Sequence, residues 1–344
     1  MSRPRGRGAS SNPANPFQQL NTEPDPELPP RRPQTEFLPD ASASLISYND
    51  SPDVPFDAGI NPYRGCEHGC VYCYARPLHE YLGYSAGLDF ETKIHVKHDA
   101  PEILKRELAA KSWTPQTINI SGATDPYQPV ERELELTRRC LAVLAECRNP
   151  VGIITKNALV TRDLDHLQEL AMYKAIKVLI SVTTLDDELA RKMEPRTSSP
   201  RARLAAIQSL AEAGVPVGTL VGPVIPGLTD HELPSIVQAV ADAGGCSADY
   251  IMLRLPLAVA DLFETWLGEE VPTHRNKVLD RIGAVRGGKR NSTEFGSRMR
   301  GEGLFAEQTK ALFEAAVRKA GLKPEQPLST EHFRRPQGPQ LELF

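Results

Sequence analysis

The chain has 344 residues, of which 40% are hydrophobic, and this is enough apolar material to fill one sizeable core. Lys and Arg number 40 against 44 Asp and Glu, so the formal charge of -4 excludes a globally basic binder of the histone kind. No apolar run approaches the roughly 18 residues of a membrane span, and the charged start of the chain lacks the apolar stretch of a signal peptide. We therefore expect a cytoplasmic protein with no membrane partner.

The first 55 residues differ in composition from the rest of the chain. They contain eleven of the thirty prolines and few aliphatic residues. A stretch of this kind cannot bury enough apolar surface to fold by itself. We expect residues 1–55 to be a disordered arm that is dispensable for the assembly of a metal site.

From residue 56 onward, short β-branched runs alternate with amphipathic segments. One segment has Ser199 as a candidate N-cap, Pro200 in its first turn and Gly214 as its stop, and the next begins at Asp230. Apolar runs between these segments predict buried parallel strands. The expected strands are residues 58–60, 117–120, 151–155, 178–182, 215–224 and 250–255. Six strand–helix units fall short of the eight of a closed barrel, so we predict an α/β fold, a partial (β/α)6 TIM-like barrel over residues 56–290.

Two further segments follow the predicted barrel. Residues 291–322 are expected to form a helical extension, with one helix over residues 304–320. Residues 323–344 are rich in Pro and Gln, which predicts a flexible tail.

Three of the six cysteines lie within eight residues. Cys66, Cys70 and Cys73 form a C-x3-C-x2-C motif, a spacing that favours a metal site over a disulfide framework in a chain of this length. Three thiolates on one loop can hold three corners of a tetrahedron or a cube, and no fourth cysteine lies nearby. One metal position therefore stays open, although His68 or His79 could close a zinc site instead.

The motif resembles the signature of the radical S-adenosylmethionine (SAM) superfamily, C-x3-C-x-aromatic-C, with Tyr72 at the aromatic position. The resemblance implies a partial barrel whose first loop holds a [4Fe-4S] cluster through Cys66, Cys70 and Cys73. It also implies that SAM binds the open iron through its amino and carboxylate groups. An electron from a donor such as flavodoxin or ferredoxin then cleaves SAM to a 5′-deoxyadenosyl radical, which abstracts a substrate hydrogen.

Further stretches are similar to the spore photoproduct lyase-like branch and to an uncharacterised bacterial group of radical SAM proteins. These stretches are residues 61–77, 121–131, 155–156, 193–196 and 223–230. Each follows a predicted strand or leads from it. In a parallel barrel the chemistry gathers at the carboxyl ends of the strands.

The segment after the second predicted strand occupies the place where the superfamily binds the amino group of SAM. The usual Gly-Gly-Glu run is absent, and Ser121, Gly122, Thr124 and Asp125 stand there instead. They offer a close backbone approach, hydroxyl groups and a carboxylate for an ammonium group. The alternative is that Asp125 merely caps a loop.

The resemblance assigns four more positions to the SAM site. Lys156 ends the third strand and is expected to pair with the carboxylate of SAM, or else to extend to water. Ser181 and Thr183 match ribose contacts, or else are packed hydroxyls. Arg196 reaches SAM or substrate, or else is an ordinary exposed arginine.

Tyr72, Tyr74 and Lys156 are the candidate catalytic residues, because the lyase-like branch resembles this chain at the two tyrosines that flank the third cysteine and at the lysine. That branch also carries a hydrogen-donating cysteine near the end of its second strand. Residues 117–131 contain none. The absence argues against thymine-dimer reversal by that route, and DNA as the substrate rests on analogy.

The basic residues of the chain are concentrated in residues 275–300. This segment holds eight Lys and Arg against two Asp and Glu, a net charge of +6, with Phe295 among them. It could grip a phosphate backbone of DNA or another nucleic acid and stack a base on the ring. The alternative is a solvated helix face with a basic loop.

The chain ends in a peptide that resembles the bacterial sliding-clamp-binding motif, Gln-Leu-(Ser/Asp)-Leu-Phe. The matching residues are Gln340, Leu341, Leu343 and Phe344. Leucine and phenylalanine gain free energy by burial in an apolar groove, so the resemblance implies a sliding clamp as partner. The alternative is that these side chains fold back on the domain.

These observations together predict a radical SAM enzyme that acts on nucleic acid, in a role similar to DNA repair. One rival keeps the enzyme and changes the substrate to RNA, protein or a small molecule. The other rival is a non-enzymatic, metal-containing binding module tethered to the clamp.

Overall fold

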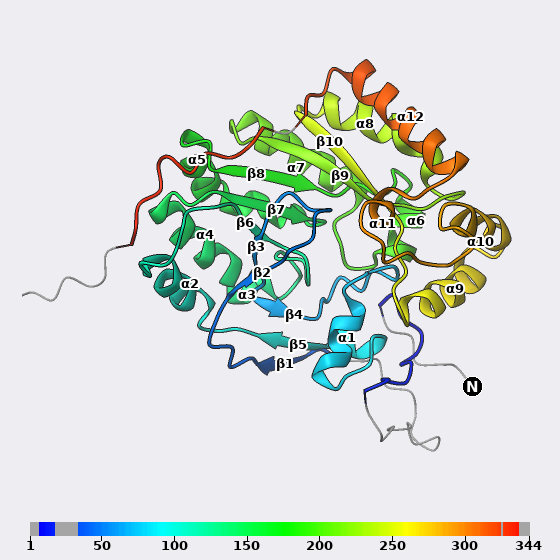
Figure 1. The fold of residues 1–344 in the computed structure, drawn as a ribbon, viewed down its shortest axis with the longest axis horizontal. Helices are drawn as coiled ribbons and strands as arrows, with labels where there is room; N and C mark the ends of the chain where they lie inside the picture. The colour runs from blue at the N-terminus through cyan, green and yellow to red at the C-terminus, as the bar shows by residue number, and fades with distance from the viewer. Residues whose placement is uncertain (1–6, 18–33, 325, 337–344) are drawn as a thin grey trace, which may run out of the picture.

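A seven-stranded sheet forms the centre of the protein, as seen in a computed structural model that describes residues 7–17, 34–324 and 326–336 (Figure 1). Its strand order is β10-β9-β8-β7-β6-β3-β2, and the six strands from β3 to β10 in this row are parallel to their neighbours. The parallel strands are β3 (Ala58–Ile60), β6 (Ile118–Ile120), β7 (Val151–Thr155), β8 (Ile176–Ile180), β9 (Val217–Val224) and β10 (Ser247–Met252). These parallel strands have the same order in the sheet as in the chain, and a crossover joins each to the next. This arrangement is the predicted partial barrel.

Helices pack along the sheet between these strands (Figure 1). Neighbouring helices also contact one another, as α2 does with α4, and α4 with α5. The α-helices are α1 (Leu88–Thr92), α2 (Ala100–Ala109), α3 (Glu131–Leu134), α4 (Leu136–Cys147), α5 (Leu164–Met172), α6 (Asp187–Met193), α7 (Pro200–Glu212), α8 (Leu233–Asp242), α9 (Val259–Glu270), α10 (Arg275–Ala284), α11 (Ser297–Arg300) and α12 (Leu304–Ala320). Short 3-10 helices are η1 (Arg76–Leu82), η2 (Ala158–Asp163) and η3 (Asp230–Glu232). Within the described residues, no helix is both long and apolar enough to cross a lipid bilayer.

Local sequence signals explain where α7 begins and ends. The Ser199 hydroxyl accepts a hydrogen bond from the Ala202 amide, Pro200 occupies the first turn, and Gly214 after the helix has a φ of 77°. Ile207 and Leu210 are fully buried against the sheet. The predicted start, stop and apolar face of this helix are therefore all confirmed.

The predicted disordered arm is wrong for its described part, because residues 34–48 contribute strands to two sheets. Strand β1 (Glu36–Pro39) pairs in parallel with β5 (Lys93–Val96), which also pairs with β4 (Tyr63–Arg64) in a second, three-stranded sheet. Strand β2 (Ile46–Tyr48) pairs antiparallel with β3 at the edge of the main sheet. Edge pairing satisfies backbone groups and needs little apolar content, so composition alone did not reveal it.

The predicted flexible tail is also wrong for its first part. The Ser329 amide donates to the Lys174 carbonyl at 2.9 Å, and the Arg334 amide donates to the Cys147 carbonyl at 2.7 Å. Arg335 donates to backbone carbonyls just before β6, including that of Trp113 at 3.2 Å. Because these carbonyls all precede strands of the barrel, residues 326–336 lie across its amino-terminal rim. The clamp-like residues 340–344 are outside the described part of the chain.

Candidate active site

The loop after β3 carries the three clustered cysteines at the carboxyl-terminal rim of the barrel. Cys66 and Cys70 are buried, Cys73 is half-buried, and all three thiols are free. The Cys66 amide donates to the Phe90 carbonyl at 2.9 Å, which ties the loop to α1. Gly69 has a φ of 66°, and a Cβ there would lie 2.5 Å from the Arg7 Cβ, so this turn requires glycine.

A buried ion pair fixes the same loop from beneath. The Arg76 guanidinium is fully buried, lies 2.5 Å from the Glu91 carboxylate and donates to the Cys70 carbonyl at 2.8 Å. The backbone amides of Gly8 and Ala9 also donate to Glu91, at 3.1 and 2.8 Å. The start of the chain therefore closes over the base of the cysteine loop.

The thiols themselves fit an iron–sulfur cluster. Burial is the main reason that the pKa of Cys70 lies well above that of an ordinary thiol and that the pKa of Cys73 is raised to about 11; the neighbouring thiols add to both shifts. Buried thiols of this kind lose their protons to a metal ion rather than to water. Three of them on one loop match the ligand set of a [4Fe-4S] cluster with one open iron.

The alternative of a closed zinc tetrahedron does not match the geometry. His79 Nε2 donates to the Lys93 carbonyl at 3.0 Å, and its ring packs against Phe90. His68 Nδ1 lies 3.4 Å from Asp125 Oδ2. Among the residues that the structure describes, no three His, Cys, Asp or Glu side chains converge on a single metal position. A [4Fe-4S] cluster needs no common centre, because each thiolate binds a separate iron.

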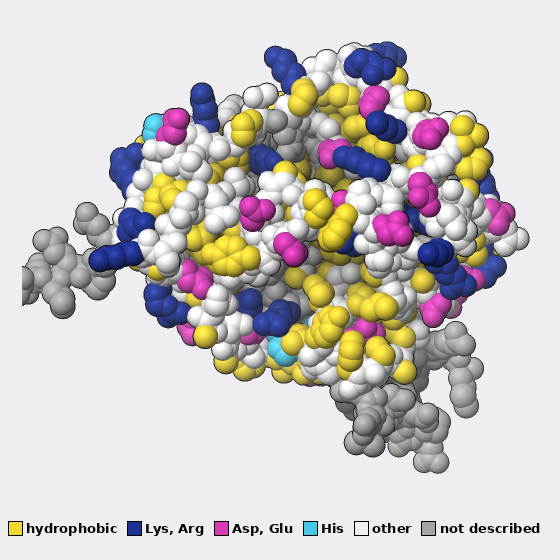
Figure 2. Space-filling model, viewed as in Figure 1, with side chains coloured by type: hydrophobic (Ala, Val, Ile, Leu, Met, Phe, Trp, Pro, Cys, Tyr) yellow, Lys and Arg dark blue, Asp and Glu magenta, His cyan; other side chains and the backbone are white. Residues whose placement is uncertain are grey.

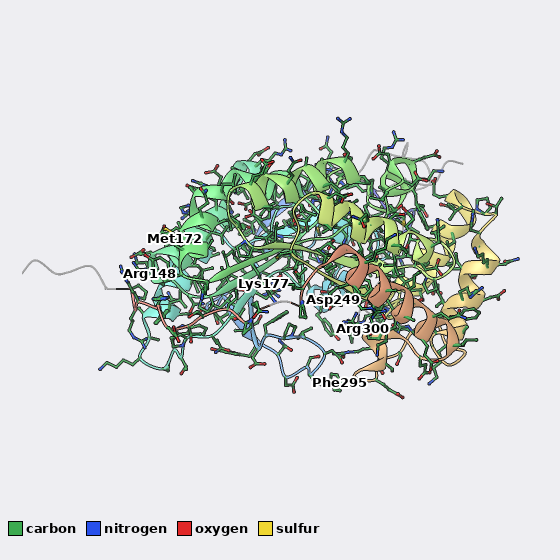
Figure 3. The ribbon with its side chains drawn as sticks, turned by 90° about the horizontal axis from the view of Figure 1, so that it is seen from above. Arg148, Met172, Lys177, Asp249, Phe295 and Arg300 are labelled. Carbon is green, nitrogen blue, oxygen red and sulfur yellow. The ribbon has the colours of Figure 1, made fainter. Side chains whose placement is uncertain are left out.

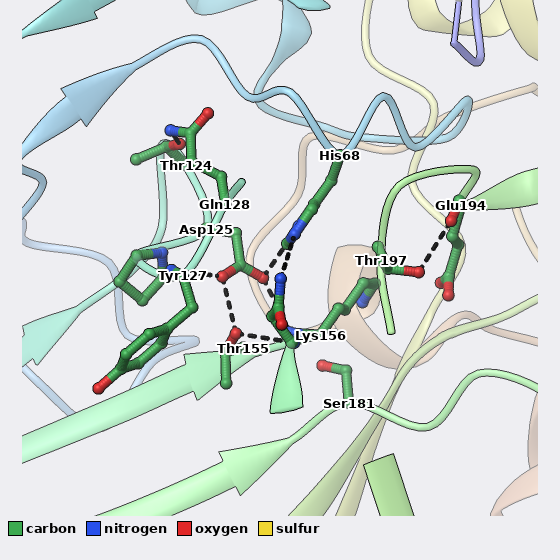
Figure 4. A network of polar contacts seen from close by, with 12 residues as sticks. His68, Thr124, Asp125, Tyr127, Gln128, Thr155, Lys156, Ser181, Glu194 and Thr197 are labelled. Atoms are coloured by element: carbon green, nitrogen blue, oxygen red, sulfur yellow. Dashed lines mark hydrogen bonds and ion pairs between the residues drawn. The ribbon is translucent and has the colours of Figure 1, made fainter. Parts of the chain in front are cut away.

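The segment after β6 lies directly against the cysteine loop (Figure 4). The Thr124 hydroxyl donates to the Gly65 carbonyl at 2.7 Å. Asp125 accepts hydrogen bonds from the Thr155 hydroxyl at 2.7 Å and from the Lys156 amide at 2.8 Å, so it joins the ends of β6 and β7. Asp125 also accepts a hydrogen bond from the Tyr127 amide at 2.9 Å, which is the loop-capping contact that the sequence analysis gave as the alternative. The contacts with Thr155 and Lys156 were not predicted.

Asp125 and His68 form a buried charged pair. Burial alone would raise the pKa of Asp125, but His68 and the hydrogen bonds lower it to about 2. Burial alone would lower the pKa of His68, but Asp125 and Cys66 raise it to about 10. The pair connects the cysteine loop to the ends of two strands through opposite charges.

Lys156 brings a positive charge to the same place. Its Nζ donates to the Gly222 carbonyl at 2.8 Å and lies 5.9 Å from the centre of the Tyr72 ring. Burial lowers its pKa, whereas the thiols of Cys70 and Cys73 oppose that shift. An ammonium group beside two cysteine ligands is well placed for an anionic group of a cofactor.

Glu194 is a buried residue that the sequence analysis missed. Its carboxylate accepts hydrogen bonds from the Tyr72 hydroxyl and, at 2.8 Å, from the Thr183 hydroxyl, and it forms an ion pair with the buried Arg203. Arg203 in turn donates to the Ser181 carbonyl at 2.9 Å. In the sequence, Glu194 lies within the segment 193–196, of which only Arg196 was predicted as a site residue.

The remaining predicted residues lie at the rim. Arg196 donates to Glu67 Oε1 at 2.8 Å, so a neighbouring carboxylate partly neutralises it. Tyr74 is 48% exposed, and its hydroxyl donates to the Gly122 carbonyl at 2.7 Å. Ser181 is buried at the end of β8. The structure thus brings all thirteen predicted site residues to one rim of the barrel.

The basic segment 275–300 is tied into the protein by its arginines. The ion pairs are Arg275 with Glu264, Arg290 with Asp261 and Glu264, Arg298 with Asp53, and Arg300 with Asp249. Figure 3 shows Arg300 beside Asp249, and it shows Phe295 at the outside of the molecule. On the face shown in Figure 2, Lys and Arg side chains are interspersed with Asp and Glu. Much of the charge of this segment is therefore neutralised within the protein.

A sequence model of the Radical SAM superfamily matches residues 60–240, more than half of the chain. The chain therefore belongs to the radical SAM superfamily. Members of this superfamily use a [4Fe-4S] cluster and SAM as cofactors.

Relatives and solved structures agree with this assignment. Uncharacterized proteins of Mycobacterium tuberculosis and Mycobacterium bovis are 37% identical over 221 residues, which cover 64% of this chain and 65% of theirs. The chain thus spans just under two thirds of the length of these relatives. A radical SAM Nalpha-GlyT isomerase of Pseudomonas phage M6 is 27% identical over 50% of this chain and 34% of its own.

Spore photoproduct lyase has the same fold. Its complex with dinucleoside spore photoproduct matches with a TM-score of 0.61 at 16% identity, over 88% of this chain and 85% of the lyase. A mutant with bound AdoMet and the same dinucleoside matches with a TM-score of 0.59 at 17% identity, over 82% and 78%. The predicted resemblance and the partial barrel are confirmed.

Proposed function

We propose that this enzyme uses radical SAM chemistry to act on nucleic acid, in a process similar to DNA repair. The observation that carries the radical chemistry is the set of three free thiols on one loop at the carboxyl-terminal rim. A lyase of the same fold that is bound to a dinucleoside photoproduct supports the substrate. The proposal places the enzyme in the cytoplasm, with flavodoxin or ferredoxin as electron donor.

The residues around the thiols have distinct tasks in this proposal. When bound, the [4Fe-4S] cluster supplies the electron that cleaves SAM to a 5′-deoxyadenosyl radical. Cys66, Cys70 and Cys73 hold it. Lys156 has three donor protons, of which Gly222 takes one, so the ammonium group can pair with the carboxylate of SAM.

The other predicted contacts surround the same space. The backbone of Ser121 and Gly122, next to the Thr124 hydroxyl, offers acceptors to the amino group of SAM. Asp125 contributes negative charge there while it holds the segment in place. Ser181 and Thr183 are assigned to the ribose side, with the Thr183 hydroxyl held by Glu194. Arg196 is assigned to the entrance beside Glu67.

Of the two tyrosines, we assign the catalytic task to Tyr74. The Tyr72 hydroxyl is committed to the buried Glu194, so this residue positions the loop. Tyr74 is 48% exposed at the rim, where its ring can touch a substrate. Residues 117–131 contain no cysteine to return a hydrogen atom, so the reaction differs in that step from the route of the lyase.

The test is an anaerobic reaction of reduced holoenzyme with SAM and oligonucleotides deuterated either on the bases or on the sugars. We expect deuterium in 5′-deoxyadenosine from one of the two labels, because hydrogen abstraction moves that atom to the cofactor fragment. A Tyr74→Ala variant, which removes the ring, should alter the product, and a Tyr81→Ala variant at another exposed tyrosine should not.

The rivals give different results in the same experiment. If 5′-deoxyadenosine forms without deuterium from any nucleic acid, the enzyme acts on a protein or a small molecule. If oligoribonucleotides alone transfer deuterium, RNA is the substrate. If no 5′-deoxyadenosine forms with a full complement of iron, the chain is a binding module.

A further inference from the structure

Arg254 is a cation at the carboxyl-terminal rim that the described part of the protein leaves largely unsatisfied. It follows β10 by two residues, so it lies on the same rim as the cysteine loop. Its guanidinium carbon lies 5.3 Å from the centre of the Tyr74 ring, and Tyr74 directly follows the cluster ligand Cys73. The arginine is therefore close to the place of reaction.

The hydrogen bonds of Arg254 are few for a guanidinium group. Nη1 contacts only a weak acceptor, the Met299 sulfur at 3.7 Å. Nε is buried, and no described residue accepts its proton. Buried donors are nearly always satisfied in native proteins, so an arginine in this state favours an acceptor from outside the described residues.

The charges around Arg254 also favour an anionic ligand. The guanidinium of Arg286 is buried beside it and donates to backbone carbonyls, including that of Leu253 at 2.6 Å. Arg298 is paired with Asp53. Burial lowers the pKa of Arg254, and Arg298 lowers it further. The three guanidinium groups of Arg254, Arg286 and Arg298 thus lie near two carboxylates, those of Asp53 and Glu302, and the remaining positive charge favours an anion.

Exposed aromatic rings flank these cations. Tyr74 packs on Arg254, and Phe295, which is 59% exposed, packs on Arg298 with 4.4 Å between the guanidinium carbon and the ring centre. Alternating cations and exposed aromatic faces suit a single-stranded nucleic acid, because phosphates pair with the cations and bases stack on the rings.

We propose that Arg254 binds a phosphate of the nucleic acid strand next to the nucleotide that reacts. This inference rests on the proposed function and adds a specificity residue to it. The arginine would hold the strand in register over Tyr74, and it would leave the ion pairs of residues 275–300 intact.

The test measures binding of a labelled single-stranded oligonucleotide to anaerobic holoenzyme at several salt concentrations. We expect Arg254→Gln to weaken binding about tenfold and to reduce the slope of log affinity against log salt by about 0.7, because one phosphate contact is lost. Arg254→Lys should keep the slope and recover part of the affinity, because lysine keeps the charge without the planar fork.

Arg290→Gln is the matched control. It removes the same charge from the same region, but its guanidinium is held by Asp261 at 3.0 Å and Glu264 at 2.6 Å. It should bind the oligonucleotide like the wild type. Binding of SAM is measured for all variants.

Three results would overturn the inference, and they differ from one another. If Arg254→Gln binds the oligonucleotide with the wild-type affinity and slope, Arg254 makes no phosphate contact. If it loses more affinity for SAM than for the oligonucleotide, its ligand is the carboxylate of SAM. If the wild-type holoenzyme binds no nucleic acid while it still binds SAM, the proposed function fails together with the inference.

Discussion

Glu194 shows how one buried carboxylate can organise the region around a cysteine loop. It is 2% exposed, and it joins Tyr72 from the loop, Thr183 after β8 and Arg203 from α7. Each partner belongs to a different part of the chain. Without this carboxylate, the guanidinium of Arg203 would be buried with no counter-charge.

The substitution Glu194→Gln should therefore lower the free energy of unfolding by about 3 kcal/mol, because breaking a buried pair leaves an uncompensated charge. Urea unfolding of the apoprotein measures the loss. Glu188→Gln on the neighbouring helix is the control: Glu188 pairs with Lys192 at the surface, with 70% of its side chain exposed, and should unfold like the wild type. Equal stability of Glu194→Gln and Glu188→Gln would contradict this account of the site.

His79 gives a prediction for pH. Burial lowers its pKa to about 4, below the usual value of about 6.5 for histidine. As the pH falls from 6.5 to 4, His79 binds a proton in the unfolded chain but stays neutral in the folded protein. The free energy of unfolding should therefore fall by about 1.4 kcal/mol per pH unit because of this residue.

Urea unfolding of the apoprotein between pH 4.5 and 7 tests the contribution of His79. His79→Gln keeps a donor for the Lys93 carbonyl but cannot titrate, so its stability should depend less on pH than that of the wild type. His274→Gln, at an exposed position, should keep the wild-type slope. Parallel pH curves for wild type and His79→Gln would show that His79 is not buried in its neutral form.

At the scale of elements, the central strands could be predicted because they are buried on both faces. Residues 151–155 form a continuous apolar run, and β7 spans Val151–Thr155 with four of its five residues buried. The helix α7 could be predicted because its cap, its first turn and its terminal glycine are all local signals. Information of this kind lies within a few neighbouring residues.

The edge strands could not be predicted in the same way. Strand β1 has four residues with no buried member, and β2 has three with one buried member. Their partners β5 and β3 lie far along the chain or across a loop, so pairing depends on the assembled sheet. The same holds for the candidate site. The cysteines could be predicted from their spacing, whereas the roles of Glu194 and of the pair of Arg76 with Glu91 depend on long-range contacts.

Residues 7–9 belong to the segment that was expected to be a dispensable arm, but in the structure they contact the base of the cysteine loop. The amides of residues 7–9 donate to Glu91, which holds Arg76 beneath Cys70. Deletion of residues 1–17 should therefore speed the loss of iron from the reconstituted holoenzyme in air, because the base of the cysteine loop becomes open to solvent.

A single substitution tests the same contact. A Cβ at Gly8 would lie 1.8 Å from the Gly69 carbonyl oxygen, so Gly8→Ala should displace the segment and speed iron loss as well. Ser11→Ala, at an exposed side chain, is the control. If the deletion and Gly8→Ala both keep the wild-type rate of iron loss, the segment does not protect the cluster.

At the scale of the whole molecule, the two rims of the barrel have different tasks. The cysteines and the SAM candidates follow strands, whereas residues 326–336 contact segments that precede strands. Arg335, near the end of the described tail, is held at the rim opposite to the reaction site.

The tail gives a separate prediction. Leu343→Ala with Phe344→Ala should abolish binding to a purified bacterial sliding clamp, because the two side chains provide most of the apolar area, worth a few kcal/mol at about 25 cal/mol per Å². Titration with a peptide of the last fifteen residues measures it, and Glu342→Ser is the control that should still bind. No saturable binding by the wild-type peptide would end the link to the clamp.

The most direct test of the central claim is formation of 5′-deoxyadenosine from SAM by the anaerobically reconstituted and chemically reduced protein. The wild type should carry about four irons per chain and form 5′-deoxyadenosine. Cys66→Ala, Cys70→Ala and Cys73→Ala should each form none, whereas Cys246→Ser, at an exposed position away from the loop, should match the wild type. Undiminished formation by any of the three loop variants, or none by an iron-loaded wild type, would contradict the account.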